Sequence, residues 1–121
     1  MTLKYKHICI DWDGTIVHDG AYPNAGKFKE NAVNVMKAII AEGGEIVIWT
    51  CRNGMEQEQI ITEKLESVDI YDFKINKPFD HFTSIFGDTA RKVFADIYID
   101  DRSIHADEID WYKIEDKLFS Y

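Results

Sequence analysis

The sequence has no long hydrophobic run, and this absence excludes two classes of protein. A membrane-spanning helix needs roughly 20 consecutive apolar residues, and no stretch of the chain approaches that length. The N-terminal segment MTLKYKHICI contains an apolar run of only four residues, which is too short for the core of a signal peptide. We therefore expect no membrane partner and a cytoplasmic location.

Basic residues and cysteines are also scarce. The chain has 14 Lys and Arg residues against 22 Asp and Glu residues, which gives a formal net charge of −8. Without a basic surplus to neutralise phosphates, we expect no nucleic-acid binding. A phosphorylated substrate, either a small molecule or a macromolecule, stays open because a bound cation can reverse the local field. The two cysteines, Cys9 and Cys51, are expected to be small buried hydrophobic residues.

The rest of the composition is that of an ordinary globular protein. Apolar residues make up 45% and charged residues 30% of the 121 residues, which is enough for one hydrophobic core. The sequence has no repeat, low-complexity tract or linker, so residues 1–121 are predicted to form a single domain. Three tryptophans, Trp12, Trp49 and Trp111, are expected to pack within that domain rather than contact ligands.

Short apolar runs alternate with segments of helical periodicity. The runs predict four buried strands, at His7 to Ile10, Glu45 to Trp49, Asp72 to Ile75 and Asp96 to Ile99. Helices are predicted over residues 28–40, from an N-cap at Asn53, and from about Asp107 to Leu118. This alternation predicts an α/β fold in which a parallel sheet has helices on both faces.

Polar residues follow three of the four predicted strands. The first strand is followed by Asp11 and Asp13 in the segment DWDGT, the second by Thr50, and the fourth by Asp100 and Asp101. Parallel sheets of this kind bind ligands outside the carboxyl ends of their strands. The sequence therefore predicts a functional site at that edge of the sheet.

Three other interpretations of these residues are less favoured. DWDGT alone could form a solvated turn, because Asp-Gly pairs are common in turns, but the matching polar residues after the other strands favour a site. An EF-hand needs Gly at its sixth position and Glu at its twelfth, and counting from Asp11 these positions hold Ile16 and Tyr22. The spacing of the histidines His7, His18, His81 and His105 gives no sign of a zinc site.

The strand-end residues suit phosphoryl transfer. A carboxylate can attack phosphorus and form an aspartyl phosphate, which divides a difficult displacement into two easier ones. Mg²⁺ prefers oxygen ligands and one or two carboxylates, which Asp11 and the Asp100–Asp101 pair could supply. Thr50 and Lys92 could stabilise the transferred oxygens. Asp13 could protonate the leaving oxygen and then activate water.

These residues resemble the four motifs of the haloacid dehalogenase (HAD) superfamily, in the order of that family and over nearly the whole chain. The resemblance implies a three-layer Rossmann-like parallel sheet with strand order 3-2-1-4. It also implies Mg²⁺ held by Asp11, the backbone carbonyl of Asp13, and the pair Asp100 and Asp101, and it leaves open which residue of that pair contacts the ion directly. An aspartate at position 13 is the phosphatase version of the first motif. The segments WTCRNG and YIDDRS are similar to those of very small bacterial or phage members.

The resemblance leaves two assignments open. The motif lysine is either Lys92 or Lys77. The segment around Lys92 is more similar to that of compact family members, whereas Lys77 lies in the segment INKPF. Arg52 could bind the substrate anion or orient the acidic residues. The gaps at residues 14–25 and 78–91 are too short for a cap domain, so the HAD-like core is predicted to be capless and its site open. A homo-oligomer could supply the missing cover.

The resemblance implies a Mg²⁺-dependent phosphatase, a phosphoric monoester hydrolase that acts through Asp11. One alternative is a phosphotransferase on the same Mg²⁺ site, although an open site lets water compete with another acceptor. A second alternative is a non-catalytic signalling module in which the phosphoaspartate persists. The order of the acidic residues differs from that of receiver modules, and Asp13 would promote hydrolysis. The substrate itself cannot be chosen from the fold.

Overall fold

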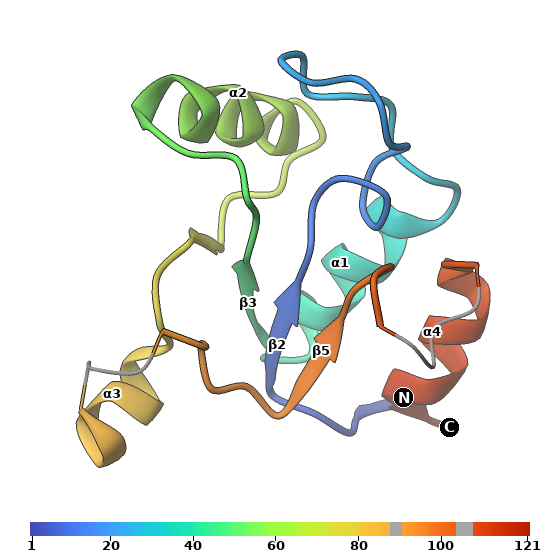
Figure 1. Cartoon of the computed structure of the whole chain (residues 1–121). Coiled ribbons are helices and arrows are strands. Elements are labelled where there is room, and N and C mark those ends of the chain that lie inside the picture. The colour runs from blue at the N-terminus through green and yellow to red at the C-terminus, as the bar shows by residue number, and fades with distance from the viewer. Residues whose placement is uncertain (88–90, 104–107) are drawn as a thin grey trace.

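The structure of the protein is a computed structural model that describes residues 1–87, 91–103 and 108–121. Six strands and four helices follow one another along these residues (Figure 1). In chain order they are β1 (Thr2–Leu3), β2 (His7–Ile10), α1 (Ala32–Ala41), β3 (Glu45–Ile48), α2 (Met55–Glu66), β4 (Lys74–Ile75), α3 (Asp80–Phe86), β5 (Ile97–Ile99), α4 (Trp111–Leu118) and β6 (Phe119–Ser120).

Four parallel strands form the central sheet, in the order β4-β3-β2-β5. The predicted α/β class is therefore confirmed. The predicted order 3-2-1-4 counts only the four predicted strands. The labels used here also count β1, a two-residue strand that pairs with β6 beside the main sheet, so each predicted strand has a label one number higher. Without β1, the sheet contains the third, second, first and fourth predicted strands in that order.

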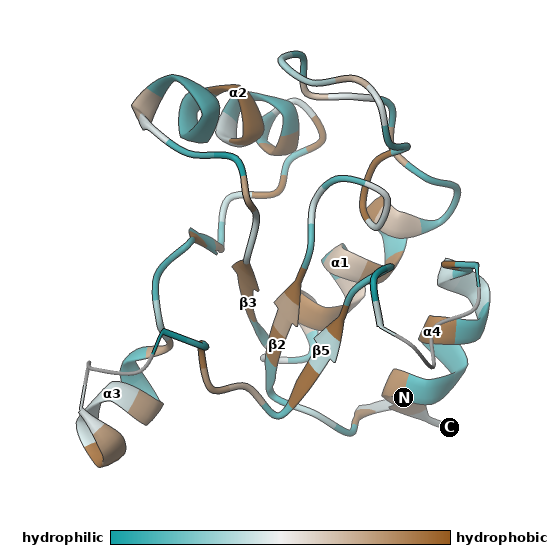
Figure 2. Cartoon of the chain, in the orientation of Figure 1, coloured by the Kyte–Doolittle hydropathy of each residue, from teal (hydrophilic) through white to brown (hydrophobic). Residues whose placement is uncertain are grey.

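One face of the sheet carries the main hydrophobic core. Isoleucines of the strands, such as Ile10 and Ile48, point to this face and contact buried residues of α1, α2 and α4. Figure 2 shows the hydrophobic residues concentrated on the central strands, with mixed hydropathy along α2. The crossovers from β2 through α1 to β3 and through α2 to β4 step in the same direction across the sheet, which puts both helices on the same face when each crossover is right-handed.

The opposite face has a thinner cover. Alternate strand residues, Cys9 and Val47, point to it and form a small buried cluster with Phe79, Val93 and Ala95. The helix on this side is α3, which has seven residues, none of them buried. The sequence analysis did not predict α3 within residues 78–91, because seven residues give too few turns for a helical period to be seen.

Several predicted boundaries were wrong by a few residues. The strands predicted from Asp72 and from Asp96 begin at Lys74 and Ile97, and the strand predicted to end at Trp49 ends at Ile48. The helix predicted from Asn53 begins at Met55 after Gly54, whose φ of 91° makes glycine suitable there. The last helix begins at Trp111, capped by the side chain of Asp110; its predicted start at Asp107, like His105, lies outside the described residues.

The prediction that both cysteines are buried was half wrong. Cys9 lies within β2 and is buried, whereas Cys51 is exposed. The physical reason is that β3 ends at Ile48, so Cys51 lies in the following loop rather than in the strand. Among the residues that the structure describes, no helix has the length and apolar character needed to cross a membrane.

Candidate functional site

Three carboxylates meet at the carboxyl ends of β2 and β5. The parallel register pairs Ile10 with Ile99, so the next residues, Asp11 and Asp100, leave adjacent strands at the same edge. The amide of Asp11 donates to the carbonyl of Ile99 at 3.0 Å and prolongs the ladder. One carboxylate oxygen from each of Asp11, Asp100 and Asp101 lies within 4.8 Å of the others. These are three of the predicted metal ligands.

Thr15 connects the carboxylates of the two strand ends. Its hydroxyl donates to Asp11 Oδ2 at 3.2 Å and lies 3.5 Å from Asp101 Oδ1, while it accepts from the Asp101 amide at 3.2 Å. Gly14 precedes it with φ of 78°, and a Cβ at this position would lie 2.2 Å from Asp101 Oδ2. Only glycine therefore allows Asp101 to approach the DWDGT loop this closely.

The charge of this cluster is not balanced by the residues within it. The pKa of the Asp11 carboxyl is raised to about 7, chiefly by burial and then by the negative charges of Asp100 and Asp101, while the Thr15 hydrogen bond offsets part of this rise. Three carboxylates at this spacing repel one another unless a proton or a cation lies among them. The oxygen donors of Asp11, Asp100 and Asp101 suit a hard divalent cation.

A cavity of about 420 Å³ opens beside the cluster. Part of its wall is charged or polar and is formed by Asp11, Asp100, Lys92 and Ser103. The rest of the wall is formed by Cys9, Trp49, Val93, Tyr98 and Ile99. Burial raises the pKa of the Cys9 thiol to about 12, and the Asp100 and Asp11 charges act in the same direction. This thiol is therefore not a nucleophile at neutral pH.

Tyr98 holds the segment that carries Lys92. The ammonium of Lys92 lies 4.8 Å from the centre of the Tyr98 ring, which is within the range of a cation–π contact. The Tyr98 hydroxyl donates to the carbonyl of Val93 at 2.5 Å and accepts from the amide of Ala95 at 3.2 Å. Since Tyr98 belongs to β5, the strand fixes the turn that brings Lys92 to the cavity.

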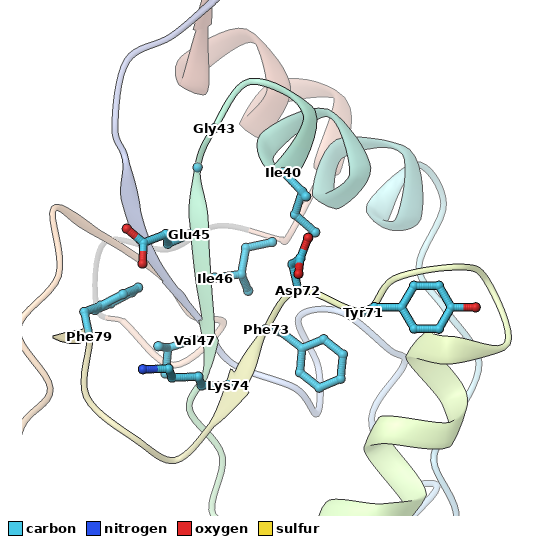
Figure 3. A pocket seen from close by; sticks show the side chains of 11 residues that line it. Ile40, Gly43, Glu45, Ile46, Val47, Tyr71, Asp72, Phe73, Lys74 and Phe79 are labelled. Atoms are coloured by element: carbon cyan, nitrogen blue, oxygen red, sulfur yellow. The ribbon is translucent and has the colours of Figure 1, made fainter. Parts of the chain in front are cut away.

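The other predicted lysine lies elsewhere. Lys77 lines a separate cavity of about 310 Å³ with residues of α2 and β4, including Thr62 and Lys74. A further cavity of about 420 Å³ lies at the amino end of β3, between Ile40, Ile46 and Phe73 (Figure 3). It matches the Asp11 cavity in volume, but it lies away from the carboxyl ends where parallel sheets bind ligands.

Asp13 does not join the acidic cluster with its side chain. Its carboxylate accepts two hydrogen bonds from Arg52, 2.9 Å from Nε to Oδ2 and 2.7 Å from Nη2 to Oδ1. Arg52 Nη1 donates to Gln57 Oε1 at 2.9 Å, and Gln57 donates in turn to the carbonyl of Pro23 at 3.3 Å. Arg52 is 4% exposed, so of its two predicted roles the structure favours the orientation of an acidic residue. The predicted use of the Asp13 carbonyl as a ligand stays a prediction.

Thr50 belongs to the same hydrogen-bonded region as Arg52. Its amide donates to Asn76 Oδ1 at 2.8 Å, and its hydroxyl accepts from the amide of Arg52 at 3.1 Å. Asn76 also donates from Nδ2 to the carbonyl of Arg52 at 3.2 Å. Asn76, which follows β4, therefore fixes the turn after β3 from the neighbouring strand.

The roles of Thr15 and Asn76 were not predicted from the sequence, and the prediction that Trp49 packs in the core was wrong. The two other tryptophans are buried as predicted: Trp12 donates to the carbonyl of Ala25 and Trp111 to the carbonyl of Thr15. Trp49 is 37% exposed and lines the Asp11 cavity, because β3 ends one residue earlier than predicted. The position of Trp49 next to Thr50, at the end of a strand, could have indicated that its side chain lies at the site.

Comparisons with known proteins give a structural similarity. No protein-family model matches the chain, and no curated protein matches it. Among solved structures, the chain is similar to a conserved protein from Bacteroides thetaiotaomicron, with 29% sequence identity and a TM-score of 0.74. The similarity covers 90% of this chain and 85% of that one, so the α/β fold described above extends over most of both proteins.

Proposed function

We propose that the protein is a capless member of the HAD superfamily, a Mg²⁺-dependent phosphatase that hydrolyses phosphomonoesters through an aspartyl phosphate on Asp11. The observation that carries this proposal is the cluster of three carboxylates at one cavity, together with an ammonium group. Asp11, Asp100 and Lys92 line that cavity, and Asp101 completes the cluster. Asp11 follows β2, Asp100 and Asp101 follow β5, and Lys92 lies in the segment before β5.

The residues of the cluster fit a magnesium ion. They offer carboxylate oxygens, which hard cations prefer. Burial, followed by the negative charges of Asp100 and Asp101, raises the pKa of Asp11, and a cation would offset that negative charge. Asp11, Asp100 and Asp101 would hold the ion, with the Asp13 carbonyl as a further ligand. When bound, Mg²⁺ would neutralise phosphate charge and orient the phosphoryl group for attack.

Each residue then has a role in two displacements. A carboxylate oxygen of Asp11 attacks phosphorus and the bond from phosphorus to the leaving oxygen breaks. Asp13 gives that oxygen a proton, which the Asp13 carboxylate has first taken from solvent. Water next attacks the phosphorus of the aspartyl phosphate, Asp13 takes a proton from it, and the phosphate leaves with Asp11 restored. Lys92 stabilises the negative charge on the transferred oxygens.

Asp13 is held in a way that is compatible with proton transfer. Each of its oxygens accepts one hydrogen bond from Arg52, and a carboxylate oxygen has a second lone pair. The side chain of Asp13 is 27% exposed, whereas that of Arg52 is 2% exposed. Arg52 is therefore a positioning residue in this proposal, and the accessible oxygens of Asp13 exchange the proton.

The test is release of phosphate from a broad panel of phosphoesters, with Mg²⁺ and with a chelator. We expect Mg²⁺-dependent turnover that Asp11→Asn abolishes, because the amide oxygen is a poor nucleophile. Asp116→Asn is the matched control, since Asp116 is exposed on α4 at a distance from the site. Turnover that persists in Asp11→Asn would contradict the proposal.

The lifetime of the aspartyl phosphate separates the proposed hydrolase from the two alternatives. Decay within seconds in water favours the hydrolase. A phosphoaspartate that decays over minutes to hours favours a signalling module. Rapid decay that needs a second acceptor favours a phosphotransferase.

A further inference from the structure

Trp49 is unusual among the tryptophans of this chain. Trp12 and Trp111 are 0% and 1% exposed, and each donates its indole N–H to a backbone carbonyl. Trp49 is 37% exposed. A large aromatic side chain in solvent gives up the favourable free energy of burial. The position therefore calls for an explanation other than core packing.

The strand register places Trp49 next to the proposed nucleophile. Ile10 and Ile48 are partners in the parallel ladder of β2 and β3, and the Trp49 amide donates to the Ile10 carbonyl at 2.9 Å. Asp11 and Trp49 are thus the next pair, on chains about 4.8 Å apart. Cys9 and Val47, two residues earlier in each strand, point to the same face. Because side chains along a strand alternate between the two faces, Asp11 and Trp49 lie on that face as well.

The cavity has two chemically different sides. Asp11, Asp100 and Lys92 give it a charged part, while Trp49, Val93 and Tyr98 give it an aromatic and aliphatic part. Its volume of about 420 Å³ lies within the range of sites for drug-sized ligands. A phosphate group bound at the charged part would leave room at the apolar part for the group that it esterifies.

We infer that Trp49 stacks on a planar ring in the leaving group, so that the substrates are phosphomonoesters of nucleosides or of other alcohols that carry an aromatic ring. This inference rests on the proposed function, because it assigns the substrate class of the same site. An indole beside the attacked phosphorus contacts the leaving group and adds stacking energy that an alkyl ester lacks. The net charge of −8 disfavours a long polyanion and favours a single phosphate held at the cation.

The experiment compares kcat/KM for three probes with the full chain and Mg²⁺: adenosine 5′-monophosphate, benzyl phosphate and glycerol 1-phosphate, all of them esters of alkyl hydroxyl groups. We expect at least one aromatic ester to exceed glycerol 1-phosphate by about fivefold or more, the lower end of base–aromatic stacking. Trp49→Ala should reduce that ratio toward one, and Trp49→Phe should preserve part of it. Tyr71→Ala is the control, since Tyr71 is exposed and lines other cavities.

A preference for adenosine 5′-monophosphate over benzyl phosphate would identify nucleosides, and equal rates would identify alcohols with an aromatic ring in general. A ratio near one in the wild type, or one that Trp49→Ala leaves intact, would overturn the inference while the phosphatase stands. If no ester is hydrolysed, the proposed function fails and the leaving-group role of Trp49 fails with it; binding then decides whether Trp49 stacks on a planar ring. Saturable quenching of tryptophan fluorescence by adenosine 5′-monophosphate, lost in Trp49→Phe, would support it, and no saturable quenching would overturn it.

Discussion

The guanidinium of Arg52 holds the carboxylate of Asp13 through two hydrogen bonds, 2.9 and 2.7 Å long. This bidentate geometry fixes the carboxylate more firmly than a single contact with a lysine would. Its members come from different segments, since Asp13 follows β2 and Arg52 follows β3. The ion pair therefore locks two strand-end loops together beside the acidic cluster.

Removal of Asp13 should destabilise the fold. In Asp13→Ala, the guanidinium of Arg52 stays buried without its carboxylate. Because the Asp13 side chain is 27% exposed, we expect a cost of about 3 kcal/mol, the lower end for breaking a buried pair. The free energy of unfolding, measured by urea denaturation, checks this value. Asp116→Ala removes an exposed carboxylate and should change stability by less than about 0.5 kcal/mol. Equal stability of the two variants would show that the Arg52 pair contributes little.

Substitution of Arg52 by lysine should separate positioning from charge. Arg52→Lys keeps the positive charge but loses the paired hydrogen bonds to Asp13 and the one to Gln57. We expect a lower kcat in the proposed reaction with a smaller effect on KM, because Asp13 is less well placed for proton transfer. An increase in KM alone would indicate that Arg52 contacts the substrate directly.

Magnesium binding should depend on pH around neutrality. The pKa of Asp11 is raised to about 7 in the absence of metal, and a ligand must be deprotonated to bind. Affinity should therefore fall by up to about tenfold for each pH unit below 7, with release of a proton on binding. Calorimetric titrations with Mg²⁺ between pH 5.5 and 8, in two buffers of different ionisation enthalpy, measure both quantities. Asp11→Asn should weaken binding and remove this proton release.

The metal-free protein should lose stability as the pH rises. The folded-state pKa of Asp11, about 7, lies above its ordinary value of 3.8, so the folded state binds more protons than the unfolded chain between these values. The contribution of Asp11 to the free energy of unfolding is therefore fully present below pH 3.8 and is lost as the pH rises through about 7. Urea denaturation with a chelator at pH 5 and pH 8 should show a smaller pH effect in Asp11→Asn than in the wild type. An identical effect would contradict the raised pKa.

Gly14 offers a test of the close approach of Asp101. Gly14→Ala places a Cβ 2.2 Å from Asp101 Oδ2 at a φ of 78°, and it should destabilise the protein through both strain and displacement of Asp101. Gly20→Ala is a matched control, because Gly20 has φ of 90° and nothing within 4 Å of its Cβ position. Strain alone costs about 1 kcal/mol or slightly more. We expect Gly14→Ala to cost more in urea denaturation and to weaken Mg²⁺ binding, which Gly20→Ala should not do.

Tyr98 should govern the position of Lys92. Tyr98→Phe removes the hydroxyl that joins Val93 and Ala95, each hydrogen bond being worth about 1 kcal/mol. Amide hydrogen exchange over residues 91–96 should become faster, and turnover should fall as it does in Lys92→Ala, though less. Tyr112→Phe removes a hydroxyl that donates to Glu30 on the surface at 2.9 Å and should change neither. Unchanged exchange in Tyr98→Phe would contradict this assignment.

The strands of the central sheet could be predicted well because each one is marked by an apolar run in the local sequence. The first strand has the predicted bounds, His7–Ile10, and the α/β class follows from apolar runs alternating with helical periods. The short elements β1, β6 and α3 were not predicted. β1 and β6 form only by pairing with each other across nearly the whole chain, a tertiary contact that the local sequence does not show. The seven residues of α3 make about two helical turns, too few for a period to be recognised.

The order of amino acids sets which chemical groups follow the strands: the Asp11 and Asp13 carboxylates, Thr50, and the Asp100–Asp101 pair. The partners of these groups depend on how the chain folds. The fold brings Asp101 to Thr15, ties Arg52 to Asp13 and turns Trp49 toward the cavity. These outcomes depend on the register of strands that are far apart in the chain. Periodicity within a segment tells which face a residue occupies, but the register between segments decides which residues meet.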